Sequence, residues 1–129
     1  MSGGPRQPSR SADDRRRALA TGHEAEAWVA QELEEDGWTV LDRNVRMGNG
    51  ELDLVVVRDR CLRFVEVKAR ASGEDGLEAM TTWKQGKLRR AAEAWLQHDR
   101  RGGYDEVAFL VAVVSMGASW SLELLDDAF

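Results

Sequence analysis

The chain has 129 residues, 43 % of them hydrophobic and 32 % charged, a balance typical of one globular domain that buries a core of its own. Its single cysteine excludes an internal disulfide framework and a cysteine-based zinc site, and no apolar run reaches the roughly 18–20 residues that a membrane span requires. The polar N-terminus has no apolar signal segment, so we expect a cytoplasmic location. The net charge of −5 is unevenly spread: residues 84–101 hold six basic residues against two acidic ones, which allows a basic surface on an acidic protein.

The chain begins with a polar tail and a helix. Residues 1–13 are rich in Gly, Pro, Ser and Arg, so we expect a disordered basic tail followed by one domain over residues 14–129. From about Asp14 to Asp36 the apolar spacing is helical, and Gly37 suits the left-handed turn that ends a helix. One face of this helix is predicted to hold Leu19, Gly22, Glu26, Val29, Ala30 and Leu33.

Three strands are predicted after this helix. Residues 38–46 have the composition of a strand, and residues 47–50 that of a turn. Residues 51–57 and 61–70 are the strongest strand candidates, and the short segment between them indicates a hairpin. In the first of the three strands we expect one side to hold Trp38, Val40 and Asp42.

A second helix and two further strands complete the pattern. Residues 77–97 have helical spacing, residues 104–114 are typical of a buried strand, and residues 119–125 alternate like a half-buried one. The resulting order α-β-β-β-α-β-β predicts an α/β protein in which helices cover a central mixed sheet. The second helix is predicted to place on one face Leu77, Met80, Lys84, Leu88, Ala91, Ala92 and Trp95.

Charged residues interrupt the hairpin where burial is expected. If the turn consists of residues 59 and 60, the register places Asp53 opposite Glu66. The same register places Glu51 opposite Lys68, on the same side of the sheet. Opposed carboxylates destabilise a sheet, the more so when buried, whereas a divalent cation between them reverses the sign of the interaction. The pair therefore indicates a site for Mg²⁺ or Mn²⁺ with a lysine ammonium beside it.

Two charged residues, Glu26 and Lys84, also occupy the apolar faces of the helices. Taken singly, each fits the edge of a helix stripe, from which a long side chain reaches water. Together with the hairpin they match one chemistry, in which carboxylates hold a metal ion that lowers the pKa of a bound water. A lysine then positions this water or stabilises the charge that develops on a phosphate. The alternative is a set of buried ion pairs without a metal, Asp53–Lys68 or Glu66–Lys84.

The basic segment of the second helix offers contacts for a nucleic acid. Its residues Lys84, Lys87, Arg89 and Arg90 would bind phosphates, which gives affinity without reading a base sequence. The alternative is a solvated helix face.

The segment "GELDLVVV…RFVEVKAR" resembles the Asp…Glu-x-Lys signature of the PD-(D/E)XK nuclease superfamily. More narrowly, the chain resembles the YraN family of small bacterial proteins, which are similar to archaeal Holliday-junction resolvases. The resemblance covers about Gly22 to Val114 and includes "GHEAE", "RN", "GELDL" and "FVEVKAR". It implies a restriction-endonuclease-like α/β/α sandwich with a central mixed sheet. It also implies an endonuclease that hydrolyses phosphodiester bonds of DNA with Mg²⁺ or Mn²⁺, branched or otherwise structured DNA being the expected substrate.

The resemblance also implies roles for individual residues. Asp53 and Glu66 would be the main metal ligands, with the backbone carbonyl of Val67 as a third oxygen. Lys68 would be the catalytic lysine, and Glu26 an outer or second metal ligand. The supporting positions would be Glu51 and Lys84.

Two positions depart from the family pattern, but the acid-acid-lysine set is complete. Ala25 stands where the family usually has Gly, and Gly103 where an Arg often precedes an aromatic-Asp pair. The alternative to an enzyme is a catalytically inactive module on the same fold that binds a nucleic acid or a protein, which the acidic net charge favours. Because resolvases usually cut as dimers, a homodimer is a further expectation.

Overall fold

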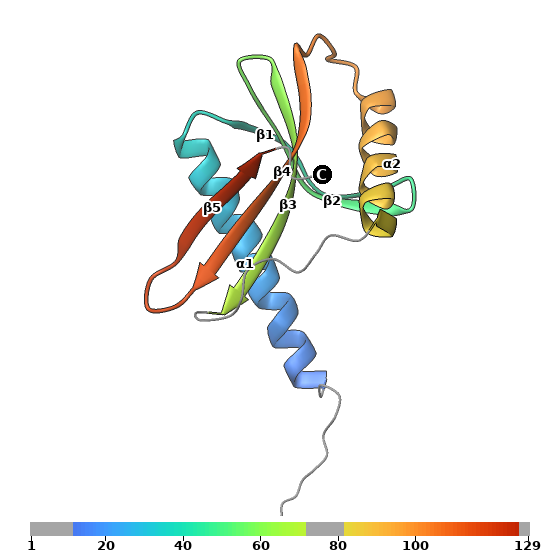
Figure 1. Cartoon of the computed structure of the whole chain (residues 1–129). Coiled ribbons are helices and arrows are strands. Elements are labelled where there is room, and N and C mark those ends of the chain that lie inside the picture. Colours follow the sequence, from blue (N-terminus) through green and yellow to red (C-terminus); the bar gives the residue numbers. More distant parts are fainter. Residues whose placement is uncertain (1–11, 72–81, 127–129) are drawn as a thin grey trace, which may run out of the picture.

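The computed structural model describes residues 12–71 and 82–126, with side chains for residues 22–70 and 84–126 (Figure 1). The elements are α1 (Ala12–Glu35), β1 (Thr39–Met47), β2 (Gly50–Arg58), β3 (Cys61–Ala71), α2 (Thr82–His98), β4 (Glu106–Met116) and β5 (Ser121–Asp126). This order confirms the predicted α-β-β-β-α-β-β pattern.

The helix boundaries differ from the predicted ones at the N-terminal ends. Helix α1 begins at Ala12 rather than at Asp14. Residues 1–11 of the expected tail and residues 77–81 of the expected second helix lie outside the described part of the chain. Neither described helix is long and apolar enough to cross a membrane.

The five strands form one sheet in the order β1-β2-β3-β4-β5. The neighbouring strands are antiparallel except for β3 and β4, which run parallel. Parallel neighbours require a crossover connection, and α2 lies in the segment that joins this pair (Figure 1). The sheet is therefore mixed, as predicted.

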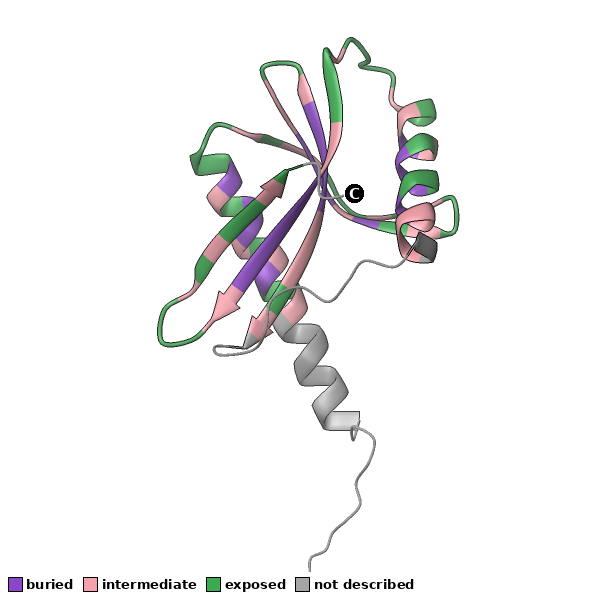
Figure 2. Ribbon diagram, viewed as in Figure 1, coloured by how far each residue is buried: buried purple, intermediate pink, exposed green. Residues whose placement is uncertain are grey.

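The two helices pack on opposite faces of this sheet. Figure 2 shows buried residues along the central strands and on both helices. The cluster under α1 contains Ala25, Val29, Ala30, Leu33, Leu54, Val56, Val65, Leu110, Ala112 and Val114. The cluster under α2 contains Leu52, Val55, Leu62, Phe64, Leu88, Ala91, Ala92 and Trp95. Two separate apolar clusters, one on each face, make the domain the predicted α/β/α sandwich.

Local turn chemistry ends α1 and sets both hairpins. Gly37 has φ +95°, and the amides of Gly37 and Trp38 bond back to Glu34 and Leu33 in the pattern of a Schellman motif. The β2–β3 turn consists of two residues with positive φ, Asp59 and Arg60, as a type I′ turn requires. The β1–β2 turn has the same form, with positive φ at Gly48 and Asn49.

A bulge in β1 overturns the predicted position of Asp42. Val40 pairs with Val56, but Asp42 pairs with Val55, so Leu41 is an extra residue that breaks the period-two alternation. As a result, Val40 packs under α1, whereas Asp42 accepts a hydrogen bond of 3.2 Å from the indole of Trp95 on α2. The prediction that Asp42 shares a side with Trp38 and Val40 is therefore wrong.

The β1–β2 turn lies directly against the backbone of α2. A Cβ atom built at Gly50 would lie 2.5 Å from the carbonyl oxygen of Lys87, and one at Gly48 would lie 2.8 Å from that of Arg90. Both distances are shorter than a real Cβ contact allows. Glycine at these two positions therefore permits the close approach that joins the hairpin to α2.

This packing predicts a specific cost for a methyl group in the turn. Gly50→Ala is expected to lower the free energy of unfolding by about 1–3 kcal/mol, because the added Cβ meets rigid helix backbone. Urea denaturation measures the change. Gly22→Ala is the matched control: its Cβ would have no neighbour within 4 Å, and in a helix it should raise stability by roughly 0.5–1 kcal/mol. Equal stability of the two variants would contradict the close packing.

Candidate active site

The strands β2 and β3 separate where the candidate acidic residues begin. Their ladder starts with Arg58 opposite Cys61, as predicted, and ends with Leu54 opposite Val65. Beyond this pair, the Asp53 carboxylate accepts a hydrogen bond of 2.8 Å from the Val67 amide. In a continued ladder, the Val67 amide would donate to a backbone carbonyl of β2. Here the Asp53 side chain accepts this hydrogen bond instead.

The predicted register is therefore right, but two predicted pairings are wrong. Asp53 and Glu66 do not form a ladder pair, and neither do Glu51 and Lys68. Glu51 of β2 instead pairs with Arg46 of the neighbouring strand β1. The separation relieves the direct opposition of two carboxylates, which would destabilise a continuous ladder.

Asp53 and Glu66 nevertheless remain electrostatic neighbours inside the fold. Burial, reinforced by the charge of Glu66, raises the pKa of Asp53 to about 8, although its bond from the Val67 amide opposes the rise. The side chain of Glu66 is only 12 % exposed. Two carboxylates held this way form a site whose negative charge is costly without a compensating cation.

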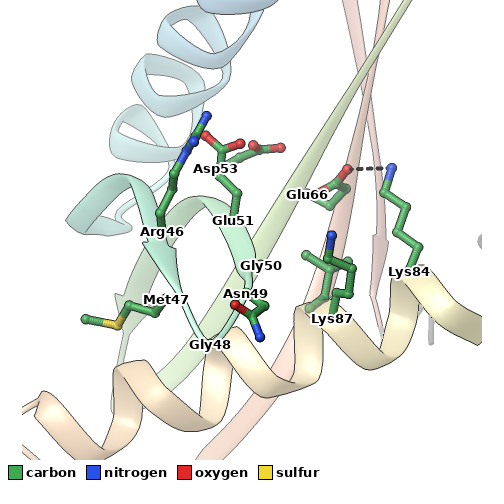
Figure 3. A pocket seen from close by; sticks show the side chains of 11 residues that line it. Arg46, Met47, Gly48, Asn49, Gly50, Glu51, Asp53, Glu66, Lys84 and Lys87 are labelled. Atoms are coloured by element: carbon green, nitrogen blue, oxygen red, sulfur yellow. Dashed lines mark ion pairs between the residues drawn. The ribbon is translucent and has the colours of Figure 1, made fainter.

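Two lysines approach Glu66. The Lys84 ammonium lies 3.3 Å from the Glu66 carboxylate, as the dashed line in Figure 3 marks, and the Lys68 ammonium lies 3.7 Å from it. Burial disfavours the charged form of Lys84, but the adjacent Lys68 amine and Glu66 carboxylate outweigh it and raise the pKa of Lys84. The structure thus brings together the predicted residues of β3 and α2.

Glu26 joins the site from the other helix. Its carboxyl group is within hydrogen-bonding reach of both Asn44 and Asp53, while its Oε1 atom is buried without a hydrogen-bond partner among the described residues. Burial raises the pKa of Glu26, and the Glu51 charge adds to the rise. Asn44 has a φ of 51° and lies across from Asp53 in the β1–β2 register. A hydrogen bond between two carboxyl groups needs a shared proton, which is the position that a cation would take over.

The site opens into a cleft of about 880 Å³ between the β1–β2 hairpin and α2 (Figure 3). Its lining mixes acidic and basic side chains: Arg46, Glu51, Asp53, Glu66, Lys84 and Lys87. Of the predicted phosphate contacts, Lys84 and Lys87 line this cleft, whereas Arg89 and Arg90 are exposed elsewhere on α2.

Arg46 is the cleft residue that the sequence reasoning missed. A signal for it existed, because a two-residue turn at residues 48 and 49 places Arg46 directly across from Glu51. The cations of this cleft therefore come from two elements, β1 and α2.

The donor chemistry of the site fits a hard divalent cation. Asp53, Glu66 and Glu26 supply carboxylate oxygens, which Mg²⁺ and Mn²⁺ prefer, and the unpartnered Oε1 of Glu26 adds an oxygen that lacks a donor. Within the described part of the chain, no three His, Cys, Asp or Glu side chains stand in metal-binding geometry. The carboxylates that would hold the ion thus lie near one another, and Glu66 is paired with the lysines.

Comparison with known proteins places this chain in a family. The sequence profile described as "Uncharacterised protein family UPF0102" matches residues 25–114, inside the span of the YraN resemblance. A UPF0102 protein of Rhodopseudomonas palustris (strain ATCC BAA-98 / CGA009) is 42 % identical over 92 residues, 71 % of each chain. Others come from Agrobacterium fabrum (36 % over 100 residues, 78 % of this chain and 82 % of the relative) and Chlorobium chlorochromatii (37 % over 117 residues, 84 % and 89 %). These matches confirm the resemblance, and the chain belongs to the UPF0102 family.

Proposed function

We propose that this protein is a Mg²⁺- or Mn²⁺-dependent endonuclease that hydrolyses phosphodiester bonds of DNA in the cytoplasm. The observation that supports this most is that Asp53 and Glu66 line an open cleft where β2 and β3 part, while the Lys68 ammonium lies 3.7 Å from Glu66. Carboxylates beside a lysine are the groups that metal-assisted phosphodiester hydrolysis uses.

Each group of the chain has a role in this chemistry. Asp53 and Glu66 would hold the cation together with the Val67 carbonyl oxygen, and Glu26, which is within hydrogen-bonding reach of Asp53, would be an outer or second ligand. A bound divalent cation would neutralise charge on the phosphate and make a water molecule more acidic. Lys68 would then direct its ammonium group at the phosphate oxygens instead of at Glu66. Lys84 would orient the Glu66 carboxylate through their ion pair.

The substrate class follows from the family resemblance. Because YraN proteins are similar to Holliday-junction resolvases, we propose branched or otherwise structured DNA as the preferred substrate. A junction presents two strands to cut, so the working unit would be a homodimer.

Cleavage assays over a panel of DNA structures test this proposal. The purified protein with Mg²⁺ or Mn²⁺ is expected to cut at least one of linear, single-stranded, flapped and four-way-junction DNA. Glu66→Ala should abolish the cutting, because it removes a proposed metal ligand. The side chain of Glu66 is only 12 % exposed, so another residue cannot easily take its place. No cutting of any substrate by the unaltered protein, or equal cutting by Glu66→Ala, would exclude a nuclease at this site.

One observation favours the alternative, a catalytically inactive module that binds a nucleic acid or a protein. Lys84 and Lys68 already lie against Glu66, so this carboxylate has cationic partners without any metal ion. Calorimetric titration with Mg²⁺ and Mn²⁺ separates the two functions. Heat of binding that disappears in Asp53→Asn supports the enzyme, and no binding by the unaltered protein supports the module.

A further inference from the structure

Arg46 lines the cleft and has no role assigned so far. It is exposed, it lies across β1–β2 from Glu51, and it makes no ion pair with another described residue. Figure 3 shows its side chain extending on the same side of the hairpin as Glu51 and Asp53. An arginine in a cleft among carboxylates, yet not paired to any carboxylate of the described residues, is available to an anion that enters from outside.

Lys87 supplies a second cation from the other wall of the same cleft. It is half-buried on α2, one helical turn beyond Lys84. Figure 3 places the carboxylates of Glu51 and Asp53 on the hairpin side and Lys87 on the helix side. The acidic set is thus flanked by a cation on each wall.

The two walls are joined by direct backbone packing. Gly50 packs against the carbonyl oxygen of Lys87 itself, and Gly48 packs against that of Arg90, too closely for any side chain. This contact sets the backbone positions of Arg46 and Lys87 relative to each other, on opposite walls of the cleft.

We propose that Arg46 and Lys87 bind backbone phosphates on the two sides of the carboxylate set, so that one DNA strand lies in the cleft between the β1–β2 hairpin and α2. A strand offers an anion at every nucleotide, which suits two separated cations, and the guanidinium fork matches phosphate oxygens. This inference rests on the proposed function and adds to it the path of the strand. It assigns Arg46, from β1, to DNA binding and removes Arg89 and Arg90 from the cleft.

The salt dependence of DNA binding tests the assignment. Binding is measured by fluorescence anisotropy in Mg²⁺ with a labelled four-way junction and a labelled duplex, in a Lys68→Ala background that retains the carboxylates. Arg46→Gln and Lys87→Gln are each expected to weaken binding roughly 10-fold and to lower the slope of log K against log [salt] by about 1. Arg46→Lys should recover the slope but only part of the affinity, because it keeps the charge and loses the fork.

Arg60→Gln is the matched control. It removes the same charge at the β2–β3 turn, outside the cleft, where Arg60 lies 3.2 Å from Asp105 in an exposed pair. This variant should bind DNA like its parent. If Arg46→Gln and Lys87→Gln also bind with the parent's slope while the unaltered protein cuts DNA, the path is wrong and the nuclease stands. If the parent binds no DNA and the unaltered protein cuts none, both proposals fall.

Discussion

Lys68→Ala is expected to lower the rate of Mg²⁺-dependent DNA cleavage by about 10²- to 10³-fold, the typical cost of removing one group that stabilises transition-state charge. The loss should fall on kcat more than on DNA binding, since Arg46 and Lys87 remain in the cleft. Single-turnover cleavage of the best substrate measures it.

The fold itself should tolerate this change. The Lys68 side chain is 28 % exposed and lies 3.7 Å from Glu66, which keeps Lys84 as a closer partner. Thermal unfolding of Lys68→Ala should therefore resemble that of the unaltered protein. A variant that unfolds normally and retains more than a tenth of the activity would show that Lys68 does not act on the reacting phosphate.

Asp53→Asn is expected to stabilise the metal-free protein at pH 8 by roughly 2–4 kcal/mol and to leave it nearly unchanged at pH 4. Burial and the Glu66 charge raise the pKa of Asp53 from its usual 3.8 to about 8, so the folded state favours the protonated form. The stability that this proton supplies is complete below pH 4 and is lost as the pH rises from about 4 to 8. Asparagine removes that loss and can still accept the bond from the Val67 amide.

Added Mg²⁺ should reverse the difference in stability between Asp53→Asn and the unaltered protein. The ion would raise the melting temperature of the unaltered protein at pH 8, by mass action on the folded state, and would do little for Asp53→Asn. Denaturant titrations with EDTA and with Mg²⁺ at both pH values measure these effects. If Asp53 instead served as half of a buried ion pair, Asp53→Asn would lose stability at pH 8 without metal.

The meeting of Glu66, Lys68 and Lys84 was predictable from local patterns. Period-two alternation placed Glu66 and Lys68 on one side of β3, and helical spacing brought Lys84 to the same side from α2. The two-residue turn at residues 59 and 60 set the β2–β3 register as predicted. These patterns depend only on residues close in sequence, so they can be recognised without a structure.

Other features depend on contacts between distant segments and could not be predicted this way. The bulge at Leu41 turns Asp42 toward Trp95 of α2. Regular alternation along β1 would have predicted the opposite side for Asp42. The end of the β2–β3 ladder before Asp53 depends on a side chain that replaces a backbone acceptor. Arg46 enters the cleft because its hairpin packs on α2.

The sequence by itself determined the element order, the two hairpin turns and the inward placement of Asp53, Glu66 and Lys84, because periodicity and turn chemistry act over a few residues. Only the tertiary structure decided how those charges meet. It parts β2 from β3 at Asp53, turns the lysines onto Glu66, and leaves Glu26 Oε1 without a partner. The physical reason is that the burial and the electrostatic surroundings of each charged group depend on α1, α2 and the sheet together, so they cannot be read from any single segment.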